Sequence, residues 1–234
     1  MIKILAIGNS FSQDATHYLQ QIAAADTVDM KVVNLYIGGC SLERHWNNIQ
    51  SEAKEYLFEV NGDSTEEYVS IQDALGMEDW DYIVTQQVSH DSGIIETYHP
   101  YLENVIEYVK KKVPSAEILL QETWAYDIDS LHGGFANYNM NQQEMYEKVS
   151  QAYRTVAKEN SVRLIPCGDV IQALRTKEPF LYGHGGMSVC RDGFHVNVIY
   201  GRYLLAAVWY KTLTGNVISD NTYVPYTKLA PNAI

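Results

Sequence analysis

Cysteine is scarce in this chain. Only three of the 234 residues are cysteines, Cys40, Cys167 and Cys190, and no two of them form a Cys-x-x-Cys pair. An odd number without metal-ligand spacing argues against both a disulfide framework and a structural zinc site. We therefore expect three buried free thiols.

Long apolar runs and basic residues are also lacking. No run approaches the roughly 18–20 residues that span a bilayer. Lys and Arg number 17 against 29 Asp and Glu, which gives a net charge of −12. An acidic surface repels phosphates and anionic lipids, so we expect neither nucleic acid nor membrane partners. The apolar run at Ile2 leaves no room for a signal peptide, which predicts a cytoplasmic protein, or an exported one if a leader preceded Met1.

What the chain does have is enough apolar material for a large core. Hydrophobic residues make up 46% of the sequence and charged residues 20%. A length of 234 residues suits a single α/β domain, so we predict one domain over residues 1–234.

Short apolar runs alternate with segments of helical periodicity. The runs are nearly continuous, which is typical of strands buried on both faces of a parallel sheet. This alternation predicts a three-layer α/β/α sandwich with a five-stranded parallel sheet. The expected strands are residues 2–7, 31–37, 82–85, 117–121 and 162–166.

Three segments depart from that alternation. Residues 56–72 predict an inserted β-hairpin that turns at Asn-Gly-Asp. Residues 123–140 predict a long functional loop. It is rich in aromatic residues such as Trp124 and Tyr126, whose apolar faces and polar groups suit the binding of sugar rings. Residues 219–234 predict an irregular tail.

The residues that suggest chemistry are Ser10, Asp192 and His195. Ser10 follows the first strand at a Gly-Asn-Ser turn, and Asp192 stands three residues before His195. A serine, a histidine that takes its proton and an acid that orients the histidine form a nucleophilic triad. The alternative is that Asp192 caps the last helix and His195 is a surface residue, because short motifs often match by chance.

Four blocks in order favour the triad. They are Gly-Asn-Ser-Phe-Ser at 8–12, Gly39, the polar cluster Gln-Gln-Val-Ser-His-Asp at 86–91, and Asp-Gly-Phe-His at 192–195. Over about residues 1–214 the chain resembles the SGNH/GDSL hydrolase superfamily, as a divergent bacterial branch of it. The resemblance implies the flavodoxin-like strand order 2-1-3-4-5.

The resemblance also implies roles for these residues. Ser10 would be the nucleophile, His195 the general base and Asp192 its orienting acid. The backbone N–H groups of Ser10 and Gly39 would bind the oxyanion, and the glycine lets the substrate approach closely.

The chain departs from the family pattern twice. Asn9 stands where the family has an aspartate, and the Gly-x-Asn-Asp tetrad that supplies a third oxyanion donor is absent. Gln87 is the candidate by amide chemistry, and His90 is the candidate by register.

These observations predict a serine esterase that hydrolyses a small acyl ester, such as an acetyl group on a carbohydrate, without a cofactor or metal. His132 and His184 each precede two glycines, but their spacing is not that of metal ligands. The altered third block leaves a binding module for a glycan or small ester as the alternative. Nucleotide binding is disfavoured, because residues 8–12 lack both G-x-G-x-x-G and the P-loop lysine.

Overall fold

The computed structural model describes residues 1–225, which are built around one seven-stranded sheet of order β4-β3-β2-β1-β5-β6-β7. Five of the strands are parallel and adjacent, in the predicted order. They are β2 (Met30–Tyr36), β1 (Ile2–Gly8), β5 (Tyr82–Thr85), β6 (Glu117–Gln121) and β7 (Arg163–Ile165).

The prediction of a five-stranded parallel sheet was wrong in its strand number. The inserted hairpin, β3 (Tyr56–Val60) and β4 (Asp63–Val69), joins the sheet as two antiparallel strands. It pairs with β2 and so satisfies backbone groups that an edge strand would leave open. The edge passes to β4, which is exposed over six of its seven residues and carries charged side chains that discourage pairing with another chain.

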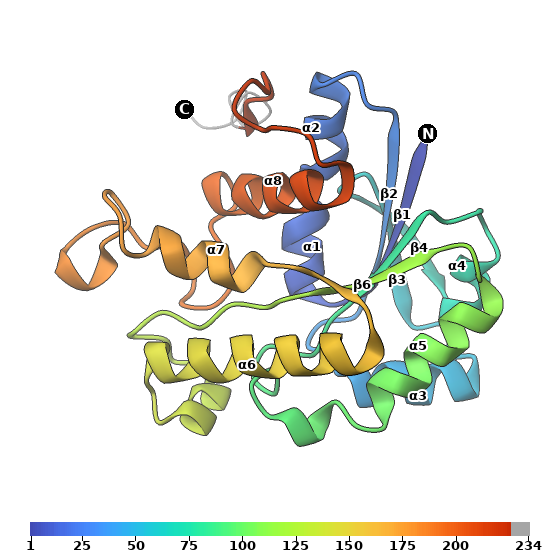
Figure 1. The fold of residues 1–234 in the computed structure, drawn as a ribbon, viewed down its shortest axis with the longest axis horizontal. Coiled ribbons are helices and arrows are strands. Elements are labelled where there is room, and N and C mark those ends of the chain that lie inside the picture. The colour runs from blue at the N-terminus through green and yellow to red at the C-terminus, as the bar shows by residue number, and fades with distance from the viewer. Residues whose placement is uncertain (226–234) are drawn as a thin grey trace.

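Helices cover both faces of the sheet (Figure 1). One face carries α1 (Ser10–Thr16), α2 (Leu19–Ala25) and α8 (Tyr200–Thr214). The other carries α3 (Leu42–Ser51), α5 (Tyr101–Lys112) and α6 (Gln142–Asn160). The remaining helices are α4 (Ile71–Leu75) and α7 (Cys167–Leu174), and 3₁₀ turns occupy Ile95–Thr97, Gly133–Tyr138 and Tyr182–His184.

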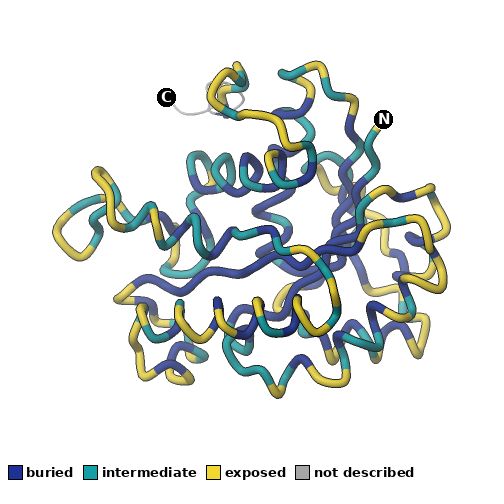
Figure 2. Tube along the Cα trace, in the orientation of Figure 1, coloured by how far each residue is buried: buried dark blue, intermediate teal, exposed yellow. Residues whose placement is uncertain are grey.

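The core lies between these layers. Ile4 to Ile7 of β1 are completely buried, as expected for a central strand covered on both faces, and the parallel strands other than the edge strand β7 are buried along most of their length (Figure 2). The predicted free thiols are confirmed: Cys40, Cys167 and Cys190 are unpaired and buried.

The segments outside the core differ more from expectation. The 123–140 loop contains a 3₁₀ turn, and its Trp124, Tyr126 and Tyr138 have no exposed surface. These rings are therefore packing groups and not exposed sugar platforms. From residue 226 on, the predicted tail lies outside the described residues.

Within residues 1–225, no helix has both the length and the apolar character needed to cross a bilayer.

Candidate active site

Ser10 lies where the strand order reverses, at the carboxyl end of β1. Asn9 caps α1: its side-chain oxygen accepts the Phe11 N–H at 3.0 Å, and Ser12 completes a capping box. Ser10 is the first residue of the helix, so its backbone N–H has no partner within the helix. The turn thus presents both the hydroxyl and an N–H that has no partner among residues 1–225.

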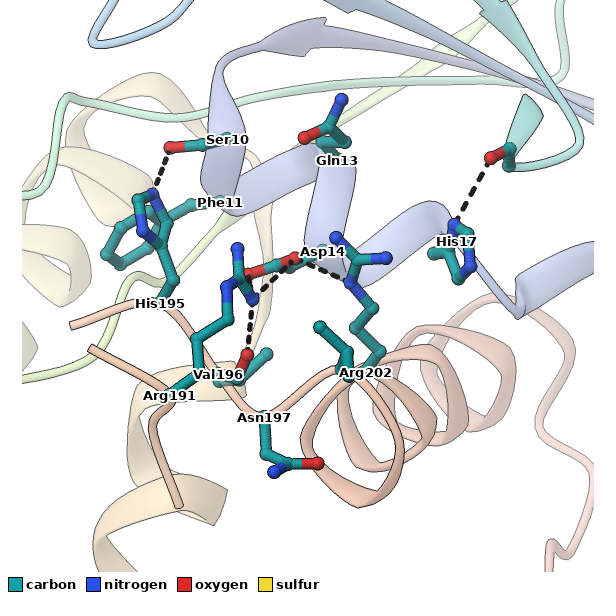
Figure 3. A network of polar contacts seen from close by, with 12 residues as sticks. Ser10, Phe11, Gln13, Asp14, His17, Arg191, His195, Val196, Asn197 and Arg202 are labelled. Atoms are coloured by element: carbon teal, nitrogen blue, oxygen red, sulfur yellow. Dashed lines mark hydrogen bonds and ion pairs between the residues drawn. The ribbon is translucent and has the colours of Figure 1, made fainter. Parts of the chain in front are cut away.

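The segment before α8 brings His195 to Ser10, 185 positions away in the chain. Ser10 Oγ lies 2.8 Å from His195 Nε2 (Figure 3). On the other side of the ring, His195 Nδ1 lies 2.7 Å from Asp192 Oδ2. Because Nδ1–H donates to the carboxylate, Nε2 is left as the acceptor for the serine proton. The three side chains form a continuous hydrogen-bonded relay.

Asp192 is held by the backbone of its own turn. Its Oδ1 accepts the N–H of His195 at 2.7 Å and that of Phe194 at 3.2 Å. Partial burial acts to raise the pKa of Asp192, but the hydrogen bonds from His195 outweigh it, and the pKa lies below its ordinary value. Asp192 does not cap α8, which begins only at Tyr200.

Gly39 follows β2 and faces the same pocket as Ser10. It is the third residue of a turn closed by the Cys40 N–H donating to the Ile37 carbonyl at 3.2 Å. Its φ of +63° favours glycine, and a Cβ at this position would meet no atom within 4 Å. The space above Gly39 is therefore open to a ligand.

A chain of amide hydrogen bonds lies beneath the site. Trp209 Nε1 donates to Gln121 Oε1 at 2.8 Å, and Gln121 Nε2 donates to Gln86 Oε1 at 2.5 Å. Gln86 Nε2 donates to Asn9 Oδ1 at 2.7 Å, and Asn9 Nδ2 donates to the Cys40 carbonyl at 3.0 Å. This chain links α8 and three parallel strands to the turn that holds Gly39.

Comparison with known proteins places the chain in a family. The model for "Domain of unknown function (DUF4886)" matches residues 3–233. The crystal structure of a DUF4886 protein from Bacteroides uniformis is 38% identical, with a TM-score of 0.89 over 96% of this chain and 87% of that one. The chain belongs to the DUF4886 family. No curated protein matches.

More distant structures share the fold of this DUF4886 member. One is a Slackia heliotrinireducens protein provisionally described as an SGNH hydrolase, at 22% identity and a TM-score of 0.61 over 91% of this chain and 98% of that one. Another is the acetyl xylan esterase AlAXEase, at 16% identity and a TM-score of 0.60 over 91% of this chain and 100% of that one. They confirm the predicted resemblance to SGNH/GDSL hydrolases at the level of the fold.

The structure does not bring Gln87 to the pocket of this DUF4886 protein. Its side-chain oxygen accepts the N–H of Leu42, at the start of α3, at 3.0 Å. Its amide nitrogen donates to the carbonyl and the hydroxyl of Thr97 at 2.9 and 3.1 Å. The amide that the sequence proposed for the oxyanion is thus committed to holding two loops together.

His90 does line the pocket, beside residues that the sequence reasoning missed. The pocket has a volume of about 260 Å³. Ser89 Oγ lies 2.8 Å from the Tyr126 hydroxyl, and the His132 ring stacks on His90 with centroids 5.7 Å apart. Ser89 belongs to the polar cluster after the third parallel strand, a signal that could have identified it. The missed lining residues are Tyr36, Val88, Ser89, His132 and Phe194.

His132 is a neutral polar group in this wall. Burial, followed by the nearby charges of His90 and His195, lowers its pKa. Its Nδ1 accepts the Gly134 N–H at 3.0 Å, which leaves the proton on Nε2 as a donor. Within the described part of the chain, no three His, Cys, Asp or Glu side chains gather in a way that could hold a metal ion.

Proposed function

We propose that this protein is a serine esterase that hydrolyses short acyl esters through Ser10, His195 and Asp192. The observation that carries the proposal is the relay from Ser10 Oγ through His195 to Asp192, with contacts of 2.8 and 2.7 Å. Both lie within the reach that proton transfer to a general base requires.

The reaction follows from that geometry. Ser10 Oγ attacks the ester carbonyl carbon while His195 Nε2 takes its proton, and Asp192 stabilises the imidazolium. The oxyanion accepts hydrogen bonds from the backbone N–H groups of Ser10 and Gly39. Collapse expels the alkoxide, which takes the proton from His195. Water, deprotonated by His195, then attacks the acyl carbon. Ser10 Oγ leaves, takes the proton back from His195, and the acid is released.

We propose Ser89 as the third oxyanion donor in place of Gln87. Ser89 is 5% exposed, and its hydroxyl contacts that of Tyr126, a fully buried residue. If Tyr126 donates to Ser89 Oγ, the Ser89 proton is free to donate to the substrate. His90 is more exposed, at 37% of its side chain, and is less firmly oriented for this role. We propose that His90 and His132 contact the alcohol portion of the substrate.

The pocket supports a small, polar substrate. Its volume of about 260 Å³ is below the roughly 300–1,000 Å³ of sites for drug-sized ligands, which favours an acetyl group over a long acyl chain. Tyr36, His90 and His132 offer hydrogen bonds to sugar hydroxyls. The acetyl xylan esterase with the same fold supports an acetylated carbohydrate as the substrate class.

A fluorophosphonate probe tests the proposal. The wild-type protein should be labelled at Ser10 and Ser10→Ala should not, while the exposed-serine control Ser51→Ala should be labelled like the wild type. Among p-nitrophenyl acetate, butyrate and octanoate, the acetate should react fastest. A folded wild-type protein that neither labels nor turns over esters, yet binds acetylated xylose, would replace the esterase with a binding module.

A further inference from the structure

The helix that carries Ser10 also carries a buried carboxylate, Asp14. It is one turn further along α1, so both residues lie on the same side of the helix, about 6 Å apart along its axis. The Asp14 side chain is 0% exposed and contacts two arginines (Figure 3). Arg191 Nη1 lies 3.1 and 2.9 Å from its two oxygens, and Arg202 Nε lies 2.7 Å from Oδ1.

Arg191 directly precedes Asp192. Its backbone N–H donates to the His195 carbonyl at 2.8 Å, and its guanidinium also donates to the Val196 carbonyl. One arginine thus closes the turn that holds Asp192 and His195, and fastens that turn to α1. A displacement of Arg191 would therefore carry His195 with it.

Other anchors hold this turn from a different element. Trp124 Nε1 donates to the Phe194 carbonyl at 2.7 Å, and the Asp127 N–H donates to the Gly193 carbonyl at 2.7 Å. Both belong to the loop after β6. Asp14 differs because it lies on the same helix as the nucleophile. Its contact with Arg191 therefore fixes the position of His195 relative to Ser10.

The energetics agree with a geometric role. Removing a carboxylate from water is costly, and a buried ion pair often stabilises a fold no more than apolar residues of the same volume would. Its contacts are nevertheless directional, since Nη1 of the Arg191 guanidinium lies within hydrogen-bond distance of both carboxylate oxygens and Arg202 Nε binds one of them from the other side chain.

The geometry points to Asp14 as a positioning residue that, through Arg191, sets the distance between Ser10 Oγ and His195 Nε2. The inference rests on the proposed esterase function. Arg202 provides the matched control: its side chain binds the same carboxylate from α8 and leaves the Arg191 contact in place.

The test compares Asp14→Asn, Arg191→Gln and Arg202→Gln on p-nitrophenyl acetate. Asp14→Asn should lower kcat about 100-fold, because a displacement of about 1 Å in the reacting groups has this effect, while KM stays within about twofold. Arg202→Gln should lower the Tm but keep kcat within about threefold of wild type. The double variant Asp14→Asn/Arg191→Gln should lose no more kcat than either single one, because each single variant already breaks the same ion pair.

Hydrogen exchange of the peptide covering residues 190–197 supplies a readout independent of activity. Exchange should speed up in Asp14→Asn and Arg191→Gln and stay slow in Arg202→Gln. If exchange speeds up in these two variants but the wild-type protein hydrolyses no ester, the positioning role of Asp14 stands and the esterase function is rejected. Exchange and kcat that are unchanged in Asp14→Asn would overturn the positioning role of Asp14. If Asp14→Asn does not fold, Arg191→Gln decides, since Arg191 is partly exposed.

Discussion

Glu122, at the carboxyl end of β6, links the stability of the protein to pH. It is 1% exposed, and one carboxylate oxygen accepts the Asp169 N–H at 2.9 Å. The other oxygen is buried and has no hydrogen-bond partner among the described residues. Burial is the largest influence and raises the pKa of Glu122 to about 7, from an ordinary value of 4.5.

The direction follows from proton binding. Between pH 4.5 and 7 the folded state keeps a proton on Glu122 that the unfolded state has lost. The free energy of unfolding therefore falls as pH rises through this window, and this contribution is constant above it. A pKa difference of about 2.5, at about 1.4 kcal/mol per pKa unit, corresponds to about 3 to 4 kcal/mol in all, most of which is lost between pH 5 and 8.

Urea unfolding of the wild type and Glu122→Gln at pH 5 and pH 8 measures this loss. Glutamine keeps an acceptor for the Asp169 N–H and never ionises, so the stability of the variant relative to wild type should increase by about 2 to 3 kcal/mol between the two pH values. The exposed control Glu67→Gln should show no such increase. A relative stability of Glu122→Gln that stays constant within about 0.5 kcal/mol would refute the reasoning from burial.

Three further outcomes follow from the site and the core. His195→Ala should reduce p-nitrophenyl acetate hydrolysis to the buffer background, a loss of about 10⁴-fold or more in kcat, and wild-type-like turnover would reject the mechanism. Ser89→Ala should lower kcat about 10²-fold with little change in KM, whereas a loss of this kind confined to His90→Ala would assign the third donor to His90. The three cysteines should react with Ellman's reagent only after denaturation, because burial raises their pKa values; a fast native thiol would contradict this.

The parallel core of the fold was predictable because its signal is local. Near-continuous apolar runs identify doubly covered strands, and the polar residues that follow them mark the edge where a site forms. The proximity of Ser10 and His195 was predicted differently, from the order of the four sequence blocks that resemble SGNH/GDSL hydrolases, and the structure places the two side chains 2.8 Å apart. The hairpin was recognisable too, but its pairing with β2 depends on which sheet edge lies within reach, and local alternation does not encode this.

The finer composition of the site could not be read in the same way. Gln87 has the chemistry of an oxyanion donor, but the Leu42 N–H at the start of α3 needs an acceptor and receives the Gln87 side chain. Asp14 gave no signal, because an acid on a short helix is usually exposed to solvent, and its two arginines come from residues about 180 positions away. Such partners are known only once the chain has folded.

The departure of Asn9 from the SGNH/GDSL pattern has a structural reason. Compared with the aspartate of the SGNH/GDSL pattern, asparagine has nearly the same shape, but it can donate hydrogen bonds as well as accept them. Here it uses both abilities: its oxygen accepts from Gln86 and from the Phe11 N–H, and its nitrogen donates to the Cys40 carbonyl. A carboxylate in the same position would face that carbonyl oxygen without a proton between them. In this chain the amide therefore joins the turn that presents Ser10 to the turn that presents Gly39.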